Sequence, residues 1–399
     1  MLADEKRLCD ADGGRLWGVG LWGPIMVVDP GSRAFVASER DGLGVATAQD
    51  GVFVGTLPPD QNIANTAFRW GGVEWTQVMW PLPEAADDRG VLLSHELFHR
   101  VQAGLGITGG HPENQHLDTV DGRYLLQLEW RALAEANRAT DAGVRTREVA
   151  DALAFRMARR HLFPRAAAEE RDQEVVEGLA EYTGITVALS SPADRAAYTL
   201  RNIDRMTTVP SFVRSFAYAS GPAYGLLLDL TGGAWRDRTR RGDDLGDLLA
   251  GALGVAPLAG GDDAVKERAA RYDGERLRAS EQARHDRLQA RAAEYRRKFV
   301  DGPTLSIPLS HMKIQFDPRT LEPLGEAGTV YPTLRVVDDW GILTVTGGAL
   351  LAPDWTRVTV VAPKDGASTG DGWDLQLNEG WTVAAGARPG TYVVTRAGR

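Results

Sequence analysis

The chain has 399 residues, more than one typical domain holds, so its length predicts two or three compact units. Its 54 acidic residues outnumber 45 basic ones, and the net charge of -9 argues against a general nucleic-acid binder. Cys9 is the only cysteine, which excludes an internal disulfide. No apolar run is long enough to span a membrane, and residues 1–6 contain no apolar core of a signal peptide. The chain is therefore expected to be either cytoplasmic or the mature form of an exported protein.

Residues 1–87 are expected to form a β-sheet, because short apolar and aromatic runs alternate there with Gly, Asp and Pro. From Asp88 the apolar residues follow the spacing of a helical face, and helices are expected at 88–104, 124–137, 147–162, 167–189, 223–230, 244–253 and 262–300. Strand patterns return after Pro303. The sequence thus predicts an α+β protein with an N-terminal β-sheet (1–87), a helical domain (88–300) and a C-terminal β-sandwich (301–399).

The most informative motif lies in the first of these helices, where His95, Glu96 and His99 form the pattern H-E-x-x-H. Residues four apart lie on one helical face, so both imidazoles can reach one cation with metal–nitrogen bonds of about 2 Å. Glu96 is rotated away from the metal but can reach a water bound to it. The alternative is a histidine pair on the surface or in the core that binds no metal. The motif predicts a zinc site with Glu96 as the general base.

A catalytic zinc ion usually has three protein ligands and one open position, so a third ligand is required. The metzincin pattern is excluded because it needs a glycine where this chain has Gln102. His111 and His116 follow in a polar loop, but nothing in the sequence determines their geometry. Glu177 and Glu181 share a face of a later predicted helix, where one can bind metal and the other can orient a ligand histidine. The alternative for this pair is two solvated glutamates.

With these residues the chain resembles the gluzincin metallopeptidases, the relatives of thermolysin and aminopeptidase N. In that family a second helix supplies a glutamate ligand within Glu-Gly-(aromatic or Leu)-Ala, and Glu177-Gly178-Leu179-Ala180 is similar to this element. The resemblance implies that His95, His99 and Glu177 bind Zn2+. It also implies that Glu181 is the acid that orients a ligand histidine.

The resemblance covers about residues 65–230 and implies a thermolysin-like fold for the helical domain. The interval between His99 and Glu177 is much longer than the family's usual one. Two additional helices, near 122–139 and 146–163, are therefore expected between the ligands.

The segment before the first helix resembles two different elements of the family. Residues 65–70 are similar to the edge strand of the thermolysin relatives, which pairs with substrate backbone. Residues 71–75 resemble the aminopeptidase Gly-x-Met-Glu-Asn loop, apart from Val73 and Trp75, and this assigns Glu74 to the substrate's α-amine. The first similarity implies an endopeptidase and the second an aminopeptidase, and both remain open. An ordinary strand with buried aromatic residues is the third possibility.

The oxyanion donor is also assigned by resemblance. In the aminopeptidase relatives a tyrosine three residues before a glycine opens an apolar helix, and residues 216–221 are similar to that arrangement. This assigns Tyr218 as the donor, with Tyr224 as the alternative. For both tyrosines, packing in the core is the competing interpretation.

The expected function is zinc-dependent hydrolysis of peptide bonds in a peptide or protein substrate. Zinc would polarise the scissile carbonyl and activate a water, and Glu96 would transfer the proton to the leaving amine. Two alternatives remain: a catalytically silent zinc-binding relative that acts as a binding module, and a metal-free structural protein. The C-terminal part, 301–399, is expected to be an accessory domain that contributes no metal ligand.

Overall fold

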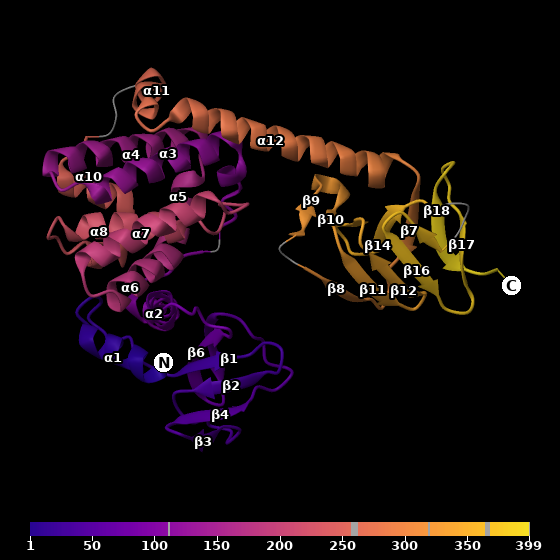
Figure 1. Cartoon of the computed structure of the whole chain (residues 1–399), viewed down its shortest axis with the longest axis horizontal. Coiled ribbons are helices and arrows are strands. Elements are labelled where there is room, and N and C mark those ends of the chain that lie inside the picture. Colours follow the sequence, from indigo (N-terminus) through magenta and orange to yellow (C-terminus); the bar gives the residue numbers. More distant parts are fainter. Residues whose placement is uncertain (111, 257–261, 318–319, 364–367, 399) are drawn as a thin grey trace. The chain divides into compact units, whose positions relative to one another are not determined.

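The computed structural model describes residues 1–110, 112–256, 262–317, 320–363 and 368–398 (Figure 1). The chain forms two compact units, Met1–Glu281 and Gln282–Arg399. The boundary lies inside the long helix α12 (Gly274–Arg296), whereas the sequence pattern predicted it at residue 300. The first part of α12 belongs to the first unit because the buried Glu281 pairs with Arg123 at 2.7 Å.

The first residues form a helix, α1 (Leu2–Asp12), although the whole range 1–87 was expected to belong to a β-sheet. Its buried residues follow helical spacing, but Glu5 and Asp12 are among them. Carboxylates on the buried face interrupt the apolar stripe from which a helix is recognised in a sequence. The helix ends at Gly13, which adopts the left-handed conformation with a φ of 56°.

A six-stranded sheet follows α1. Its strands are β1 (Ile25–Val28), β2 (Ala34–Ala37), β3 (Thr47–Gln49), β4 (Val52–Thr56), β5 (Thr66–Trp70) and β6 (Val73–Met79). Their order is β3-β4-β2-β1-β6-β5, and all neighbours are antiparallel except β1 and β6. Met26, Val28 and Trp75 are fully buried in the core on this sheet. Strand β5 is the last strand in this order and therefore forms one edge of the sheet.

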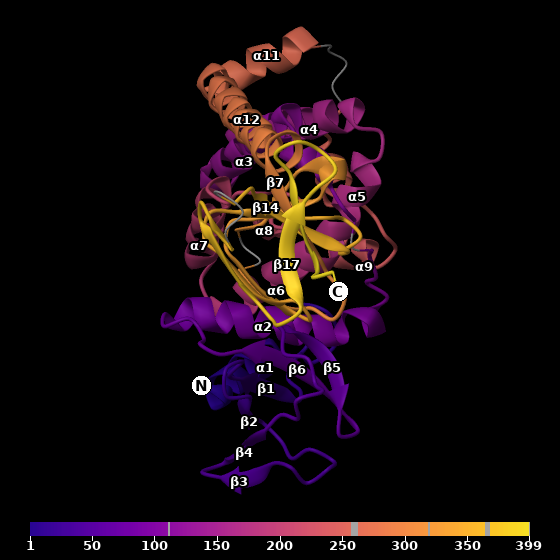
Figure 2. The same ribbon diagram turned by 90° about the vertical axis from the view of Figure 1, so that its right-hand side faces the viewer.

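Helix α2 (Ala86–Gln102) lies between the sheet and the helical layer, in contact with β6 on one side and α6 on the other (Figure 2). The described helices that follow in the first unit, besides α12 and short turns, are α3 (Val120–Arg138), α4 (Ala142–Leu162), α5 (Ala166–Gln173), α6 (Leu179–Ala188), α7 (Pro192–Thr207), α8 (Ala217–Asp229), α9 (Trp235–Thr239), α10 (Leu245–Leu253) and α11 (Asp262–Ala270). Helices α3 and α4 confirm the two additional helices predicted between the ligands. They pack against each other.

A buried network of charged side chains joins α3 and α4 to the π turn η3 (Glu174–Gly178). Arg156 contacts Glu129 at 3.0 Å and also binds Glu174, while Arg159 contacts Glu129 at 2.6 Å. These side chains are buried, and the transfer of a charged group from water to the interior costs free energy. Close pairing of opposite charges offsets this cost. Because Glu174 begins the π turn, the network holds the backbone that carries Glu177.

The second unit contains two sheets. Their strands are β7 (Thr304–Pro308), β8 (Lys313–Phe316), β9 (Glu322–Pro323), β10 (Thr329–Tyr331), β11 (Leu334–Asp338), β12 (Gly341–Val345), β13 (Ala349–Leu351), β14 (Arg357–Val361), β15 (Thr369–Gly370), β16 (Trp373–Leu377), β17 (Trp381–Ala385) and β18 (Tyr392–Arg396). One sheet has the order β17-β18-β7-β14-β13-β10-β9 and the other β15-β16-β12-β11-β8. Both contribute to one apolar core, for example Ile307 from the first and Leu343 from the second.

The described chain is thus mixed α and β, with an N-terminal sheet, a helical middle and C-terminal sheets. This arrangement confirms the coarse fold that the sequence predicted. None of the helices within the described ranges combines the length and the apolar character needed to cross a bilayer.

The buried Glu5 makes stability depend on pH. Its carboxylate accepts a hydrogen bond from Ser94 at 2.6 Å, and burial raises its pKa from 4.5 to about 7. Between these two values the folded chain keeps a proton that the unfolded chain has released, so stability falls as the pH rises through this window. We expect this loss to be on the order of 3 kcal/mol. In Glu5→Gln this pH-dependent loss of stability should disappear, as measured by urea unfolding between pH 4.5 and 8.

The exposed Glu135→Gln is the matched control, because its carboxylate pairs with Arg138 on the surface. Its unfolding free energy should follow the wild-type pH dependence. Parallel curves for Glu5→Gln and the wild type would contradict the role given to Glu5.

Candidate metal centre

Helix α2 presents three residues of the motif toward the interior of the first unit. His95 and Glu96 are buried, and His99 is half-buried one turn further along. The first turn contains Asp87 and Asp88, whose charges stabilise the positive end of the helix. The helix therefore holds both imidazoles on one face, as the four-residue spacing predicted.

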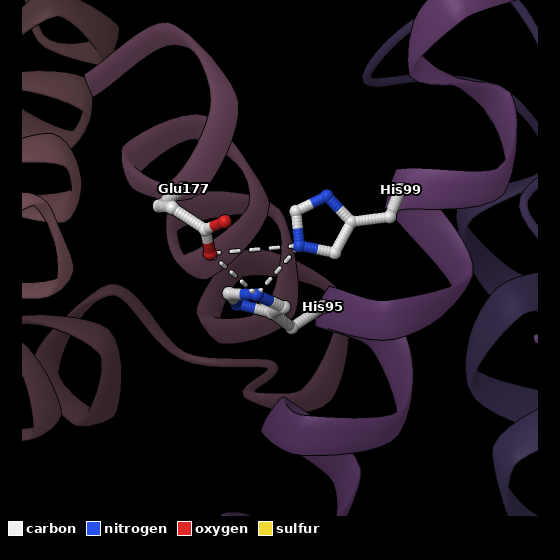
Figure 3. Close-up of side chains that lie close together, drawn as sticks. All are labelled: His95, His99 and Glu177. Atoms are coloured by element: carbon white, nitrogen blue, oxygen red, sulfur yellow. Dashed lines mark hydrogen bonds and ion pairs between the residues drawn. The ribbon is translucent and has the colours of Figure 1, made fainter. Parts of the chain in front are cut away.

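Three potential ligand atoms converge between α2 and the π turn η3 (Figure 3). Nε2 of His95 lies 3.0 Å from Nε2 of His99, and Oε2 of Glu177 lies 3.5 Å and 3.6 Å from these two nitrogens. Tetrahedral zinc with bonds of about 2.0–2.1 Å separates its ligand atoms by about 3.3 Å. The donor set of two imidazoles and one carboxylate, and its spacing, therefore fit a zinc ion with an open coordination position.

Two features of the backbone place Glu177 at this point. It lies in a π turn, and π turns occur frequently at functional sites because they shift the register of a helix locally. The next residue, Gly178, packs against Gly221 of α8, where a side chain at position 221 would collide with its backbone. This close approach of two helices brings Glu177 and Tyr218 together.

Glu181 contacts His95, the first histidine of the motif. Its Oε2 lies 3.0 Å from Nδ1 of His95, and its Oε1 accepts a hydrogen bond of 2.7 Å from Asn202 of α7. A carboxylate on Nδ1 keeps the proton there and leaves Nε2 free to bind a cation. Glu181 thus lies against His95, on the side of the ring that faces away from His99 and Glu177.

Gln102 has the corresponding position at His99, the second histidine of the motif. Its Oε1 lies 2.7 Å from Nδ1 of His99, and its amide nitrogen donates to the carbonyls of Val175 and Val176 in the π turn. In the sequence alone, Gln102 serves only to exclude the metzincin pattern. Its spacing of three residues from His99 on one helical face was the available signal.

Glu96 lies beside the cluster. Its side chain is buried, and its Oε2 has no hydrogen-bond partner among the described residues. Burial raises the pKa of this carboxyl, while the charges of His95 and His99 oppose the rise. A buried carboxylate with an unpartnered oxygen beside a group of potential metal ligands is suited to accept a proton from water.

Tyr218 reaches the cluster from α8. Its hydroxyl donates a hydrogen bond of 2.7 Å to Oε2 of Glu177, and its ring stacks on that of His95 with centroids 5.5 Å apart. Burial and the neighbouring carboxylate of Glu177 raise the pKa of Tyr218, so it stays a neutral donor. The alternative donor, Tyr224, is fully buried and binds Glu129 instead.

The charges within the cluster support one another. Burial disfavours a charged His95, but hydrogen bonds to Glu177 and Glu181 raise its pKa to about 10. Burial likewise disfavours a charged Glu177, yet hydrogen bonds from both histidines and Tyr218 lower its pKa. Without a cation the site therefore stabilises an anionic Glu177 beside a protonated His95, and a metal ion that binds to Nε2 would displace the proton of that nitrogen.

Three other candidates lie outside this cluster or outside the described residues. Glu74 is exposed on β6, opposite Arg69 of β5, and belongs to no group of potential ligands among the described residues. His116 is buried, but its Nε2 binds Glu170 at 2.9 Å. His111 lies outside the described residues.

A second group of potential ligands, in the second unit, consists of His311, Asp338 and Asp339. Asp338 accepts hydrogen bonds from the backbone N–H groups of Ser310 and His311, so its carboxylate already stabilises a turn. His311 and Asp339 are exposed. This group has the character of a surface turn.

A comparison of the chain with known protein families found no matching family model. Comparisons with curated proteins and with solved structures also found no match. Functional inference therefore rests on the geometry of the cluster around His95, His99 and Glu177.

Proposed function

We propose that the chain is a zinc-dependent metallopeptidase. The observation that carries the proposal is the convergence of His95, His99 and Glu177 within 4.8 Å of one another, beside the buried carboxylate of Glu96. The carboxylate on His95 and the amide on His99 support the same conclusion, because such partners orient metal-binding imidazoles.

The proposed reaction divides the work among these residues. A zinc ion held by the three ligands would supply Lewis acidity and lower the pKa of a water toward about 7. Glu96 takes the proton of the attacking water and delivers it to the leaving amine. Tyr218 transfers its hydrogen bond from Glu177 to the oxyanion that develops on the substrate.

We further propose a thermolysin-like arrangement for the catalytic part, with substrate bound along β5. This strand is at the edge of the N-terminal sheet, where it pairs only with β6 among the described strands, and it contacts α2. An extended peptide can add to such an edge through backbone hydrogen bonds. This observation favours the edge-strand interpretation of residues 65–70.

Tyr218→Phe is expected to lower kcat by about 10²–10³, because it removes one neutral donor to the oxyanion. The phenyl ring can still stack on His95, so zinc should be retained. Steady-state kinetics and metal analysis of the same preparation measure both effects.

Tyr224→Phe is the matched control, because its hydroxyl binds Glu129 away from the cluster. It should lower stability but leave kcat within about twofold of the wild type. Equal kcat values for Tyr218→Phe and the wild type would contradict the role of Tyr218.

The proposed function is tested by incubation of the zinc-loaded chain with a mixture of unstructured peptides, followed by mass spectrometry of the products. We expect cleavage that a zinc chelator abolishes and added zinc restores. The absence of cleavage from a fully zinc-loaded chain would contradict the proposal and favour a catalytically silent binding module.

A further inference from the structure

Gln102 is a buried amide at the end of α2 whose hydrogen bonds connect two parts of the proposed metal centre. Its Oε1 lies 2.7 Å from Nδ1 of His99. Its Nε2 lies 3.2 Å and 2.8 Å from the carbonyl oxygens of Val175 and Val176. The side chain is only 5 % exposed, so these partners satisfy groups that have little access to water.

The partners of Gln102 determine the orientation of its amide. Both backbone partners are carbonyl oxygens, which only accept hydrogen bonds, so the NH2 group must face Val175 and Val176. The amide oxygen then faces His99. An amide in the opposite orientation would place oxygen against two oxygens and lose both hydrogen bonds.

This orientation selects one tautomer of His99. Because Oε1 of Gln102 only accepts, Nδ1 of His99 must carry a proton. The lone pair of the neutral ring is then on Nε2, the nitrogen that faces His95 and Glu177.

The same amide also holds the third ligand. Val175 and Val176 belong to the π turn that contains Glu177, and a π turn alters the regular hydrogen-bond ladder of a helix. The two hydrogen bonds from Gln102 tie this turn to the helix that carries both histidines. The distance between His99 and Glu177 therefore depends on Gln102.

We infer that Gln102 is a positioning residue that fixes both the Nδ1–H tautomer of His99 and the place of Glu177 relative to it. The inference rests on the proposed metal centre and adds a role that neither the H-E-x-x-H motif nor the Glu-Gly-Leu-Ala element contains. Glu181 performs only the first of these two tasks for His95.

The tautomer is measured first, in the metal-free chain of 399 residues. Long-range ¹H–¹⁵N correlation spectra distinguish protonation at Nδ1 from protonation at Nε2, and a His99→Gln variant assigns the resonances. We expect a single Nδ1–H tautomer of His99 in the wild type and a mixture in Gln102→Leu. Gln102→Glu restores an acceptor and should restore the single tautomer.

Zinc affinity is measured second, by competition with a chelator. Gln102→Leu should bind zinc about 10–100-fold more weakly than the wild type, as expected for the loss of a group that orients a ligand. Gln102→Glu should lie between the two, because it supports His99 but has no N–H for Val175 and Val176. Gln127→Leu is the matched control, since Gln127 is a buried glutamine that donates to Glu281 instead.

The inference is overturned if Gln102→Leu keeps the single tautomer, or if its zinc affinity stays within twofold of the wild type. It is also overturned if Gln127→Leu weakens zinc binding as much, because the effect would then be general destabilisation. These results are distinct from failure of the proposed function. A wild-type chain that binds zinc and shows the expected tautomer, but cleaves no peptide, would contradict the peptidase and still support the role of Gln102.

Discussion

Glu96→Gln should lower peptide hydrolysis by about 10²–10⁴-fold while the chain keeps its zinc and its fold. The amide has nearly the same shape as the carboxylate, so it fits the buried position beside His95. The amide cannot, however, accept the proton of the attacking water. Among the glutamates that the structure describes, no other has a buried carboxylate oxygen without a hydrogen-bond partner. Turnover of a cleaved peptide, with zinc content from the same sample, gives both quantities.

Asp87→Asn is the control for this substitution, because it makes the same chemical change at an exposed position on the same helix. Its turnover should equal that of the wild type. A Glu96→Gln variant that retains zinc and wild-type turnover would eliminate Glu96 as the base.

The second large effect is expected from Glu177→Ala, which should lose zinc more completely than Glu181→Ala. Glu177 offers an oxygen 3.5 Å and 3.6 Å from the two ligand nitrogens, and its removal leaves two ligands where a catalytic zinc site needs three. Glu181 is not one of the three proposed ligands but contacts one of them, His95, so its removal should weaken zinc binding by about 10–100-fold. Chelator competition with both variants measures the difference.

The order of the two affinities decides the assignment of the third ligand. If Glu181→Ala binds zinc more weakly than Glu177→Ala, the roles of the two glutamates are reversed. If neither substitution changes the affinity, the π turn does not supply a ligand.

The parts of the cluster that the sequence could predict are those whose geometry depends on a single helix. His95, Glu96 and His99 share one turn, and the spacing of Glu177 and Glu181 indicated one face of a second helix. The interruption of that second helix by a π turn could not be predicted, since it depends on packing against α8 and on a buried charge network.

Residues that support the site across the fold were missed. Asn202, the partner of Glu181, lies on α7, which is not among the helices predicted from the sequence. The signals for this helix were present, because Ser191 caps it and Pro192 occupies its first turn. Gln102 was missed because its role depends on carbonyl groups more than 70 residues away in the sequence.

The proposed function requires that His95, His99 and Glu177 together bind one zinc ion. The most direct test is the metal content of the 399-residue chain purified without added zinc, measured by elemental mass spectrometry beside a His95→Ala/His99→Ala variant. We predict about one zinc per wild-type chain and almost none in the variant, whose remaining ligand binds zinc too weakly. A wild-type chain that neither contains zinc nor takes it up on addition, or a variant that retains it, would contradict the claim.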